Sequence, residues 1–524
     1  MNLLRSAATV SGLTLLSRVA GLVRETLIAT IFGAGPLTDA FFVAQRLPNM
    51  LRRMFAEGAF SQAFVPLLAK TRARADKSGS LEEAQLLVNR VATALFWAVL
   101  VITVLGIVFA PQIVTVVASG LTKDPETFDS AVWMTRLMFP YILLVSLVAL
   151  SAGILNTWQN FAIPAITPVL LNLSMIGAAL FLADWFDPPI YALAFGVLLG
   201  GILQLALQIP ALAKTGMLPK LSLNVRAAYA DPATRKILKL MAPAILAVSA
   251  AQISLLINTH IASRLAPGSV SWISFGDRLM EFPNGLLGVA IGTVLLPSLS
   301  AATSSENPHA FSILLDWGLR LALLLAAPCA LALALMAEPL TSMIYHYGQF
   351  DARDVAMTAL AVQGYAAGLI ALIGIKVLAP GFFAQQNVAT PVKISVATIL
   401  VTQACNLVFV PQFAHAGLPL AISVGAWVNA ATLLILLLHS GRFQPRPGWL
   451  RFLLQIGLGL IVLAGLLWWW IPQYDWVAMG DTPFNRVGMV VATVVAGAGV
   501  YAGALLLVGV RPADFSRRPE TAGT

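Results

Sequence analysis

Long apolar segments separated by short polar loops recur along the whole chain. Each segment reaches the length of about 20 mostly apolar residues that a bilayer-spanning helix needs. The pattern therefore predicts an all-α polytopic membrane protein with fourteen transmembrane helices. Their expected ranges are 7–31, 37–69, 88–118, 133–155, 160–183, 188–213, 237–264, 270–301, 312–336, 355–384, 390–411, 416–440, 449–471 and 485–509.

Two short motifs occur twice, at nearly the same separation. Arg46-Leu47-Pro48-Asn49 resembles Arg278-Leu279 with Pro283-Asn284, and Gln159-Asn160 with Pro164 resembles Gln386-Asn387 with Pro391. Copies with an even number of helices share one orientation, as in transporters built from parallel repeats. We interpret the chain as two six-helix lobes, a linker and an added pair of helices. The ranges are 1–213 for the N-lobe, 214–236 for a basic cytoplasmic linker, 237–440 for the C-lobe, and 441–524 for two further helices and a tail.

Charge places this chain outside the ordinary soluble proteins. Only 10% of its residues are charged, against about 25% in soluble domains. The net charge of +9 would favour nucleic-acid binding in a soluble protein. Here the lysines and arginines gather in alternate loops, after predicted helices 2, 6, 12 and 14, and such loops stay in the cytoplasm. We therefore expect both termini to be cytoplasmic and no nucleic-acid partner.

Three predicted helices carry ionisable residues inside their apolar segments. They are Arg18, Arg24 and Glu25 in the first helix, Asp39, Arg46, Arg52, Arg53 and Glu57 in the second, and Asp277, Arg278 and Glu281 in the eighth. An arginine at the bilayer centre costs at least ~2.5–3.5 kcal/mol, so several of them should face a hydrated interior. The planar guanidinium binds phosphate oxygens through paired hydrogen bonds. The pattern favours a cavity for an anionic ligand.

A purely structural interpretation of these charges stays open. Arg24 with Glu25 or Asp39, and Arg278 with Asp277 or Glu281, could form ion pairs that lock helices together. Arg52 and Arg53 could extend to the membrane surface. Asp39, Arg46 and Arg53 are spaced seven apart, which predicts one shared helical face.

The sequence lacks the residue patterns typical of metal binding, nucleotide binding and glycosyl transfer. The histidines are scattered without metal-ligand spacing, no Gly-rich phosphate loop follows a strand, and no carboxylate constellation of a glycosyltransferase is present. Cys329 and Cys405 lie inside apolar helices and indicate no disulfide or metal. We expect a transporter rather than an enzyme, with no cofactor and no metal.

Three stretches carry a resemblance to a known family. SRVAGLVRE at 17–25, LPNMLRRMFAEGAF at 47–60 and DRLMEFP at 277–283 are similar to helices 1, 2 and 8 of the MurJ-type lipid II flippases. The likeness extends helix by helix over essentially the whole chain. That family belongs to the multidrug/oligosaccharidyl-lipid/polysaccharide exporter superfamily.

The resemblance implies two lobes around a central cavity and a groove at helices 13 and 14 for a polyprenyl tail. The substrate would be lipid II, the undecaprenyl-diphosphate-linked disaccharide-pentapeptide of peptidoglycan synthesis. It also implies which residues act. We expect the head group to be bound by Arg18, Arg24, Arg52 and Arg278, and the cavity to be supported or gated by Ser17, Asp39, Arg53, Glu57, Asp277 and Glu281.

Further expectations follow from the same resemblance. The protein would work by alternating access in the bacterial inner membrane, among membrane lipids and in association with the cell-wall synthesis machinery. Some relatives bind sodium through carboxylates on helices 7 and 11. Here helix 7 offers Asn258 and no acid, and helix 11 has none, which argues against a sodium site.

Two alternatives within the superfamily remain. A flippase for another polyprenyl-linked glycan would use the same arginines and differ in its sugar contacts. A drug or cation antiporter would need acids in its cavity, whereas arginine dominates here.

Overall fold

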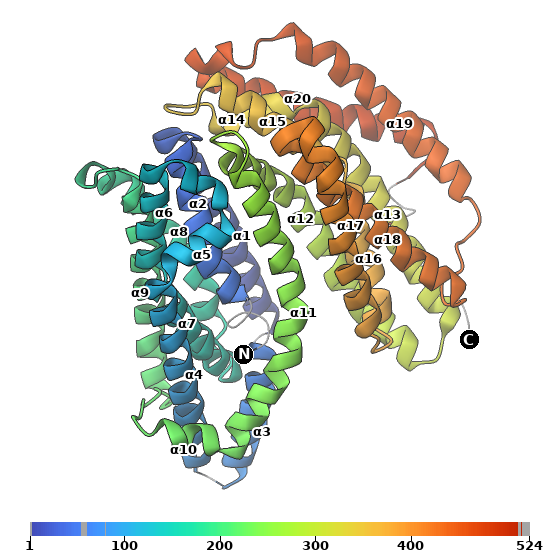
Figure 1. Ribbon diagram of the computed structural model, residues 1–524. Helices are drawn as coiled ribbons and strands as arrows, with labels where there is room; N and C mark the ends of the chain where they lie inside the picture. The colour runs from blue at the N-terminus through green and yellow to red at the C-terminus, as the bar shows by residue number, and fades with distance from the viewer. Residues whose placement is uncertain (1–2, 54–59, 79, 512–514, 516–524) are drawn as a thin grey trace. The chain divides into compact units, whose positions relative to one another are not determined.

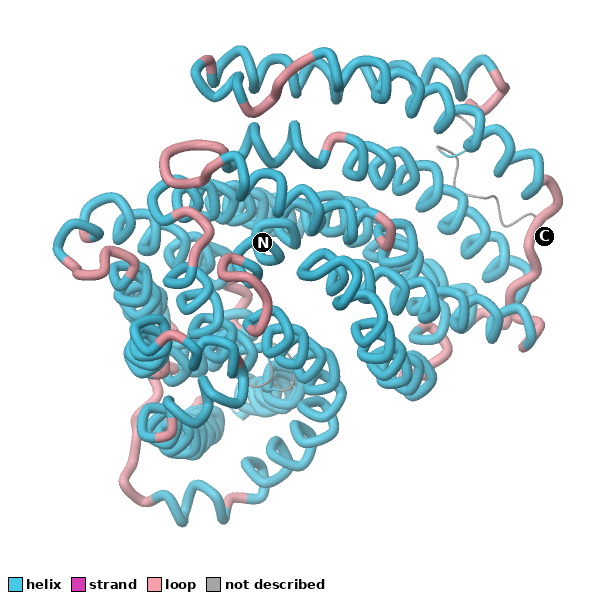
Figure 2. The backbone as a smooth tube through the Cα atoms, turned by 45° about the horizontal axis from the view of Figure 1, so that its top comes forward, coloured by secondary structure: helices cyan, strands magenta, loops and turns pink. Residues whose placement is uncertain are grey.

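The computed structural model describes residues 3–53, 60–78, 80–511 and 515. Helices make up all its regular structure, and no strand occurs in these described ranges (Figure 2). Within them, ten helical segments are long and apolar enough to cross a membrane. The predicted all-α membrane fold is confirmed, and every predicted transmembrane range contains a helix.

Contacts divide the chain into two compact units, Met1–Val270 and Ser271–Thr524 (Figure 1). Unit 1 contains α1 to α11. Their bounds are α1 Leu3–Phe32, α2 Pro36–Leu51, α3 Ser61–Ser78, α4 Glu82–Val108, α5 Ala110–Val117, α6 Pro125–Met138, α7 Pro140–Thr157, α8 Ala162–Phe181, α9 Tyr191–Lys214, α10 Val225–Ala230 and α11 Pro232–Ser263.

Unit 2 contains the remaining helices, of which α12 begins two residues before the division. Their bounds are α12 Ser269–Ser304, α13 Pro308–Leu335, α14 Ala337–Tyr345, α15 Ala352–Ala366, α16 Leu369–Phe383, α17 Ala389–Phe413, α18 Gly417–His439, α19 Trp449–Trp470 and α20 Pro483–Leu507. By contacts, α11 belongs to unit 1, because it packs against α3, α4 and α5. The repeat boundary expected at residue 237 is a different kind of division and stays a prediction.

Several expected helices are interrupted where the backbone cannot continue. Pro111 and Pro140 lie in the first turns of α5 and α7. Proline lacks an N–H and suits the start of a helix, so ranges 88–118 and 133–155 each divide into two helices. Range 355–384 divides at Gly368, where a Cβ atom would lie 2.6 Å from Ser423 Cα. A residue without a side chain lets α18 approach at that break.

The expected helix at 37–69 is interrupted in a different way. After α2 ends at Leu51, Arg52 and Arg53 are π-helical, and so is Phe60, immediately before α3. A π-turn is wider than an α-turn and is common at functional sites. The prediction of one shared face for Asp39, Arg46 and Arg53 assumed a continuous α-helix. Asp39 and Arg46 lie in α2, seven residues apart, whereas Arg53 lies beyond the end of α2 on the π-helical turn.

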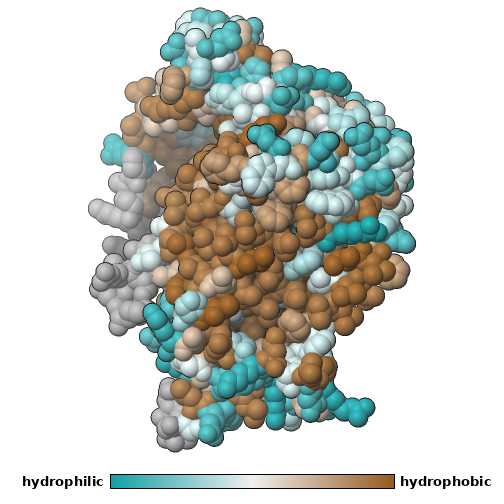
Figure 3. Space-filling view, turned by 90° about the vertical axis from the view of Figure 1, so that its left-hand side faces the viewer, coloured by the Kyte–Doolittle hydropathy of each residue, from teal (hydrophilic) through white to brown (hydrophobic). Residues whose placement is uncertain are grey.

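Rows of large apolar side chains are exposed on the long helices. Figure 3 shows a face on which hydrophobic residues form a broad belt between hydrophilic ends. On α4 and α9 such exposed residues include Val101, Val104, Leu105, Ile202, Leu203 and Leu207. Apolar patches of this extent are unstable against water and stable against lipid, which is the surface of a multi-pass membrane protein.

Helix α20 is anchored to the α14–α15 connection by a buried arginine. Arg486 is fully buried; it donates to Ser342 Oγ at 3.0 Å and to the His346 main-chain oxygen at 2.9 Å. His346 Nδ1 lies 3.0 Å from the same guanidinium. Since arginine only donates hydrogen bonds, this ring nitrogen must be the unprotonated acceptor. Burial and the Arg486 charge lower the pKa of His346, although Asp351 acts in the opposite direction.

This anchor predicts a pH-dependent stability. A histidine whose pKa is lower in the folded state loses stability as pH falls through its unfolded value of about 6.5. The melting temperature of the purified protein should therefore drop as pH is lowered from 8 to 5, and part of that drop should vanish in His346→Asn, which keeps an acceptor but does not titrate. Replacing the exposed His439 by Asn should change nothing. An unaltered pH dependence in His346→Asn would rule out this role.

Candidate functional site

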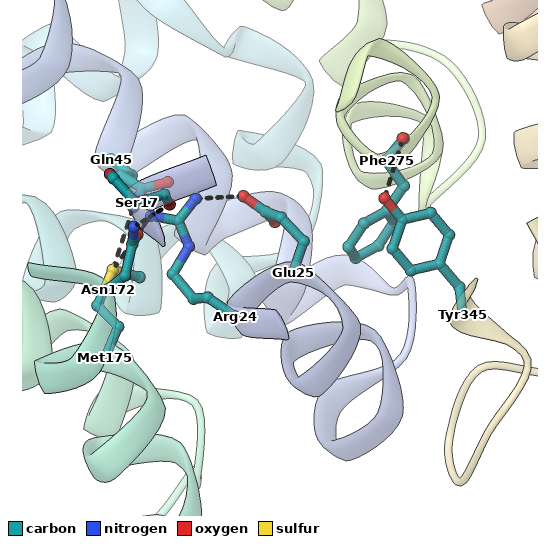
Figure 4. Close-up of polar contacts among 8 residues, drawn as sticks. All are labelled: Ser17, Arg24, Glu25, Gln45, Asn172, Met175, Phe275 and Tyr345. Carbon is teal, nitrogen blue, oxygen red and sulfur yellow. Dashed lines mark hydrogen bonds and ion pairs between the residues drawn. The ribbon is translucent and has the colours of Figure 1, made fainter. Parts of the chain in front are cut away.

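A network of polar contacts holds α1 against α8 in unit 1 (Figure 4). Arg24 pairs with Glu25 and donates from Nη1 to Asn172 Oδ1 at 2.8 Å. Asn172 in turn donates from Nδ2 to the main-chain oxygen of Ser17 at 3.0 Å. Only 11% of the Arg24 side chain is exposed, so its charge is held at a fixed place inside the unit.

Arg52 lies close to this network from the end of α2. It lies within electrostatic range of Tyr141, Arg53 and Arg24. Tyr141 also interacts with Arg24. Two of the four arginines expected to bind substrate, Arg24 of α1 and Arg52 after α2, therefore lie within electrostatic range of each other in unit 1.

Two other charged residues of α2 tie the helix to the end of unit 1. The buried Asp39 carboxylate accepts a hydrogen bond from the Gly268 N–H at 2.7 Å. Arg46 donates to the Thr259 hydroxyl of α11. These contacts join α2 to α11 and to the connection between α11 and α12, so both residues position helices here.

The remaining candidates of unit 1 are found in different surroundings. Arg18 and Arg53 are exposed, and neither hydrogen-bonds to another described residue. Ser17 is half-buried and contributes its main-chain oxygen to the Asn172 contact. Glu57 lies outside the described residues. Their expected roles stay predictions.

The candidates of α12 belong to unit 2. Asp277 and Arg278 are exposed, and Glu281 is half-buried and accepts from Asn284 Nδ2 at 3.4 Å. Lys376 of α16 donates from Nζ to the main-chain oxygen of Asn284 at 3.0 Å. The Lys376 side chain passes Gly288, where a Cβ atom would lie 2.3 Å from Lys376 Cδ.

Sequence reasoning missed three residues of these clusters. Lys376 gave a usable signal, because it is the one charged residue in the α16 sequence. Asn172 and Tyr141 gave little, since one polar or aromatic residue in an apolar helix is common. Only the fold places them beside Arg24 and Arg52.

Unit 2 also contains an apolar cavity of about 660 Å³. It is lined mainly by α13, α19 and α20, together with Leu287 of α12, Met336, and Arg511 and Phe515 at the C-terminal end of the described chain. The lining from these helices includes Leu324, Cys329, Leu463, Leu467, Tyr501 and Leu505. The cavity lies at helices α19 and α20, where the sequence analysis expects a groove for the polyprenyl tail. That role stays a prediction.

Two solved structures share the architecture of this chain. An inward-facing multidrug-resistance MATE family transporter of the MOP superfamily aligns with 82% of this chain and 97% of its own, at a TM-score of 0.62 and 15% identity. A "Lipid II flippase MurJ, inward closed conformation" aligns with 95% of this chain and 98% of its own, at a TM-score of 0.79 and 24% identity. The chain has the same fold as these two solved structures.

Sequence comparison narrows the class to one family. The family model "Lipid II flippase MurJ" matches residues 28–496. A "Lipid II flippase MurJ" from Burkholderia cenocepacia is 51% identical over 99% of this chain and 100% of its own length. A "Probable lipid II flippase MurJ" from Haemophilus influenzae is 38% identical over 95% and 98%. The chain belongs to the MurJ family of lipid II flippases, as the sequence motifs predicted.

Removing the asparagine bridge should loosen α1. Asn172→Ala deletes both the acceptor for Arg24 and the donor to Ser17, and each hydrogen bond contributes about 1 kcal/mol. We expect a lower melting temperature and faster hydrogen exchange over residues 17–25 than in the wild type. Asn485→Ala, at an exposed position of α20, is the control. Unchanged exchange in Asn172→Ala would mean that packing alone holds α1.

Proposed function

We propose that this chain moves lipid II from the cytoplasmic to the outer leaflet of the bacterial inner membrane. The observation that carries the proposal is the presence of Arg24, largely buried, and Arg52 within electrostatic range of each other in unit 1 of a MurJ-family chain. Charges buried within a membrane protein are costly and usually mark a substrate pathway. The protein would act as a transporter and would not alter its substrate covalently.

The diphosphate of the head group is the chemical match for these arginines. Two guanidiniums within electrostatic range repel each other. An anion bound between them attracts both and so offsets the energy of that repulsion. Arg24 keeps donor capacity for such a ligand, because its Nε atom is buried without a hydrogen-bond partner among the described residues. Arg18, exposed nearby on the same helix, and Arg278 of α12 would complete the binding set.

The hydrocarbon tail requires a different surface. The apolar cavity along α13, α19 and α20 would hold part of the undecaprenyl chain, as its lining is almost entirely aliphatic and aromatic. A tail kept in this cavity avoids water while the charged head group passes through the protein. The head group would thus bind at the arginines, and the hydrocarbon tail in the apolar cavity.

The proposed topology has fourteen crossings and both termini in the cytoplasm. The segment Ala389–His439, with 51 residues, is long enough for two crossings, and α1, α2–α3 and α11 would cross despite their charges. Transport would follow alternating access between two lobes. After release, an inside-negative potential would draw the cationic cavity back, at about 2.3 kcal/mol per charge per 100 mV.

Arginine substitutions test the proposal directly. Arg24→Ala and Arg52→Ala should each abolish growth when they replace the wild-type protein in the native cell, with amounts in the membrane unchanged. Arg442→Ala, at an exposed loop position, should support normal growth. Arg24→Lys should restore function only in part, because lysine keeps the charge but not the paired donors.

Normal growth with Arg24→Ala and Arg52→Ala together, at normal lipid II export, would remove both residues from the binding site. If cells without this protein export lipid II normally but lose another surface glycan, the substrate is the polyprenyl-linked precursor of that glycan.

A further inference from the structure

Hydrogen bonds hold the linker between α9 and α11 against α4. The Lys220 N–H donates to Asn89 Oδ1 at 2.7 Å. The Tyr229 hydroxyl donates to the Ala94 main-chain oxygen at 2.8 Å. Helix α10, within this linker, packs beside the first parts of α4 and α11 (Figure 1). The linker is therefore a fixed part of unit 1, and its side chains keep their places relative to α4.

A narrow apolar groove lies between α4 and α11, next to this linker. Its volume is about 170 Å³, and its walls run from Val91 to Ile102 on α4 and from Thr234 to Met241 on α11. Along α4 this length is about 16 Å. Leu238 in its wall is 41% exposed, so the groove opens to the outside. Sites for drug-sized ligands hold at least about 300 Å³, so this groove fits part of one hydrocarbon chain.

Positive charge surrounds the end of the groove where both helices begin. The segment 214–240 has six basic residues, all exposed: Lys214, Lys220, Arg226, Arg235, Lys236 and Lys239. The single acid of this segment, Asp231, is buried and pairs with Arg90. An uncompensated cationic surface therefore covers the linker.

Arg235 lies at the rim of the groove. It precedes Leu238 by three residues and so shares that side of α11. Its Nε donates to the Tyr229 main-chain oxygen at 3.0 Å, which fixes the guanidinium. No described residue accepts from its two terminal nitrogens. This pair of donors matches the oxygens of a phosphate group.

Exposed leucines accompany the cations of the linker. Leu221 is 49% exposed and Leu223 is 84% exposed. Between them, the Ser222 main-chain oxygen accepts from Trp97 Nε1 at 3.1 Å. Tryptophan is typical of the membrane interface, and segments that combine leucine with basic residues insert their apolar side chains among lipid head groups. The linker has the composition of a membrane-surface segment.

The groove and the cations together define the partner. A nucleic acid or an acidic peptide would pair with the cations and leave the groove and the leucines facing water. A neutral lipid would fill the groove but give Arg235 no anionic acceptor. An anionic phospholipid satisfies both, with a hydrocarbon chain and a phosphate in one molecule. The cytoplasmic leaflet, where the proposed topology places the linker, carries a negative surface potential that attracts such basic segments.

We propose that an anionic phospholipid of the cytoplasmic leaflet binds between α4 and α11, with part of one acyl chain in the groove and its phosphate at Arg235. The bound lipid fastens the linker to the membrane surface. The inference rests on the cytoplasmic position of the linker in the proposed function, and it is independent of which lipid is transported.

The test is native mass spectrometry of the purified full-length protein in detergent, with phosphatidylglycerol, phosphatidylcholine and lipid II as separate probes. Arg235→Gln removes the charge and keeps a donor for the Tyr229 main-chain oxygen. We expect its affinity for phosphatidylglycerol to fall about tenfold, through the loss of charge-assisted hydrogen bonds. Its affinity for phosphatidylcholine and its melting temperature should not change.

The neighbouring lysine provides a matched control. Lys236 is exposed, lies two positions before Leu238 and so points away from the groove. Lys236→Gln removes the same charge, and should keep the affinity for phosphatidylglycerol within about twofold of the wild type, because an exposed charge at a distance is screened.

A substitution inside the groove gives a second, independent test. Ala98 is half-buried in the groove wall, and Ala98→Phe fills the space for the acyl chain. We expect it to weaken binding of both phospholipids and to leave lipid II binding unchanged. This variant also tests the site if Arg235→Gln does not fold.

Three results would overturn the site. They are wild-type affinity for phosphatidylglycerol in Arg235→Gln, an equal loss in Lys236→Gln, and equal binding of both phospholipids by the wild type. Loss of lipid II binding in Ala98→Phe would also overturn it, because the groove would then hold the tail of lipid II. Absence of lipid II binding in the wild type, with phosphatidylglycerol still bound, would remove the proposed function and leave this site standing.

Discussion

A guanidinium inside a membrane protein needs acceptors for its N–H groups, because neither lipid nor an apolar core supplies them. Arg24 obtains two oxygen acceptors, from Asn172 and Glu25, and the weaker sulfur acceptor of Met175. The same asparagine holds the backbone of α1 at Ser17. The order of unit 1 around α1 and α8 depends on this arrangement. It satisfies the arginine only in part, and a site that is half-satisfied by protein is suited to an anionic ligand.

Structural and ligand-binding roles are divided among neighbouring charges of the same helices. Arg46 holds α2 to α11 through Thr259, and Asp39 holds α2 to the α11–α12 connection through Gly268. Arg52 follows on a π-helical turn, within electrostatic range of Arg24. The apolar cavity at α19 and α20 lies in unit 2, apart in sequence from these charges. This division fits a substrate with a charged head and a long hydrocarbon tail.

Much of the fold could be predicted from sequence, because a membrane-spanning segment is recognised by the length of its apolar run. Breaks inside those runs were missed where they depend on tertiary contacts, as at Gly368 against Ser423. The arginines of the candidate site were visible as charges in apolar segments, and the Arg24–Glu25 pair was among the alternatives considered. Asn172 and Tyr141 were not visible, since their importance comes only from neighbours distant in the chain.

The most direct test of the central claim is depletion of this protein in its native cell, with lipid II measured on the outer leaflet of the inner membrane. The account predicts that outer-leaflet lipid II falls, that lipid II accumulates on the cytoplasmic side, and that the cells lyse. Healthy cells with normal outer-leaflet lipid II, under depletion confirmed for the protein itself, would contradict it.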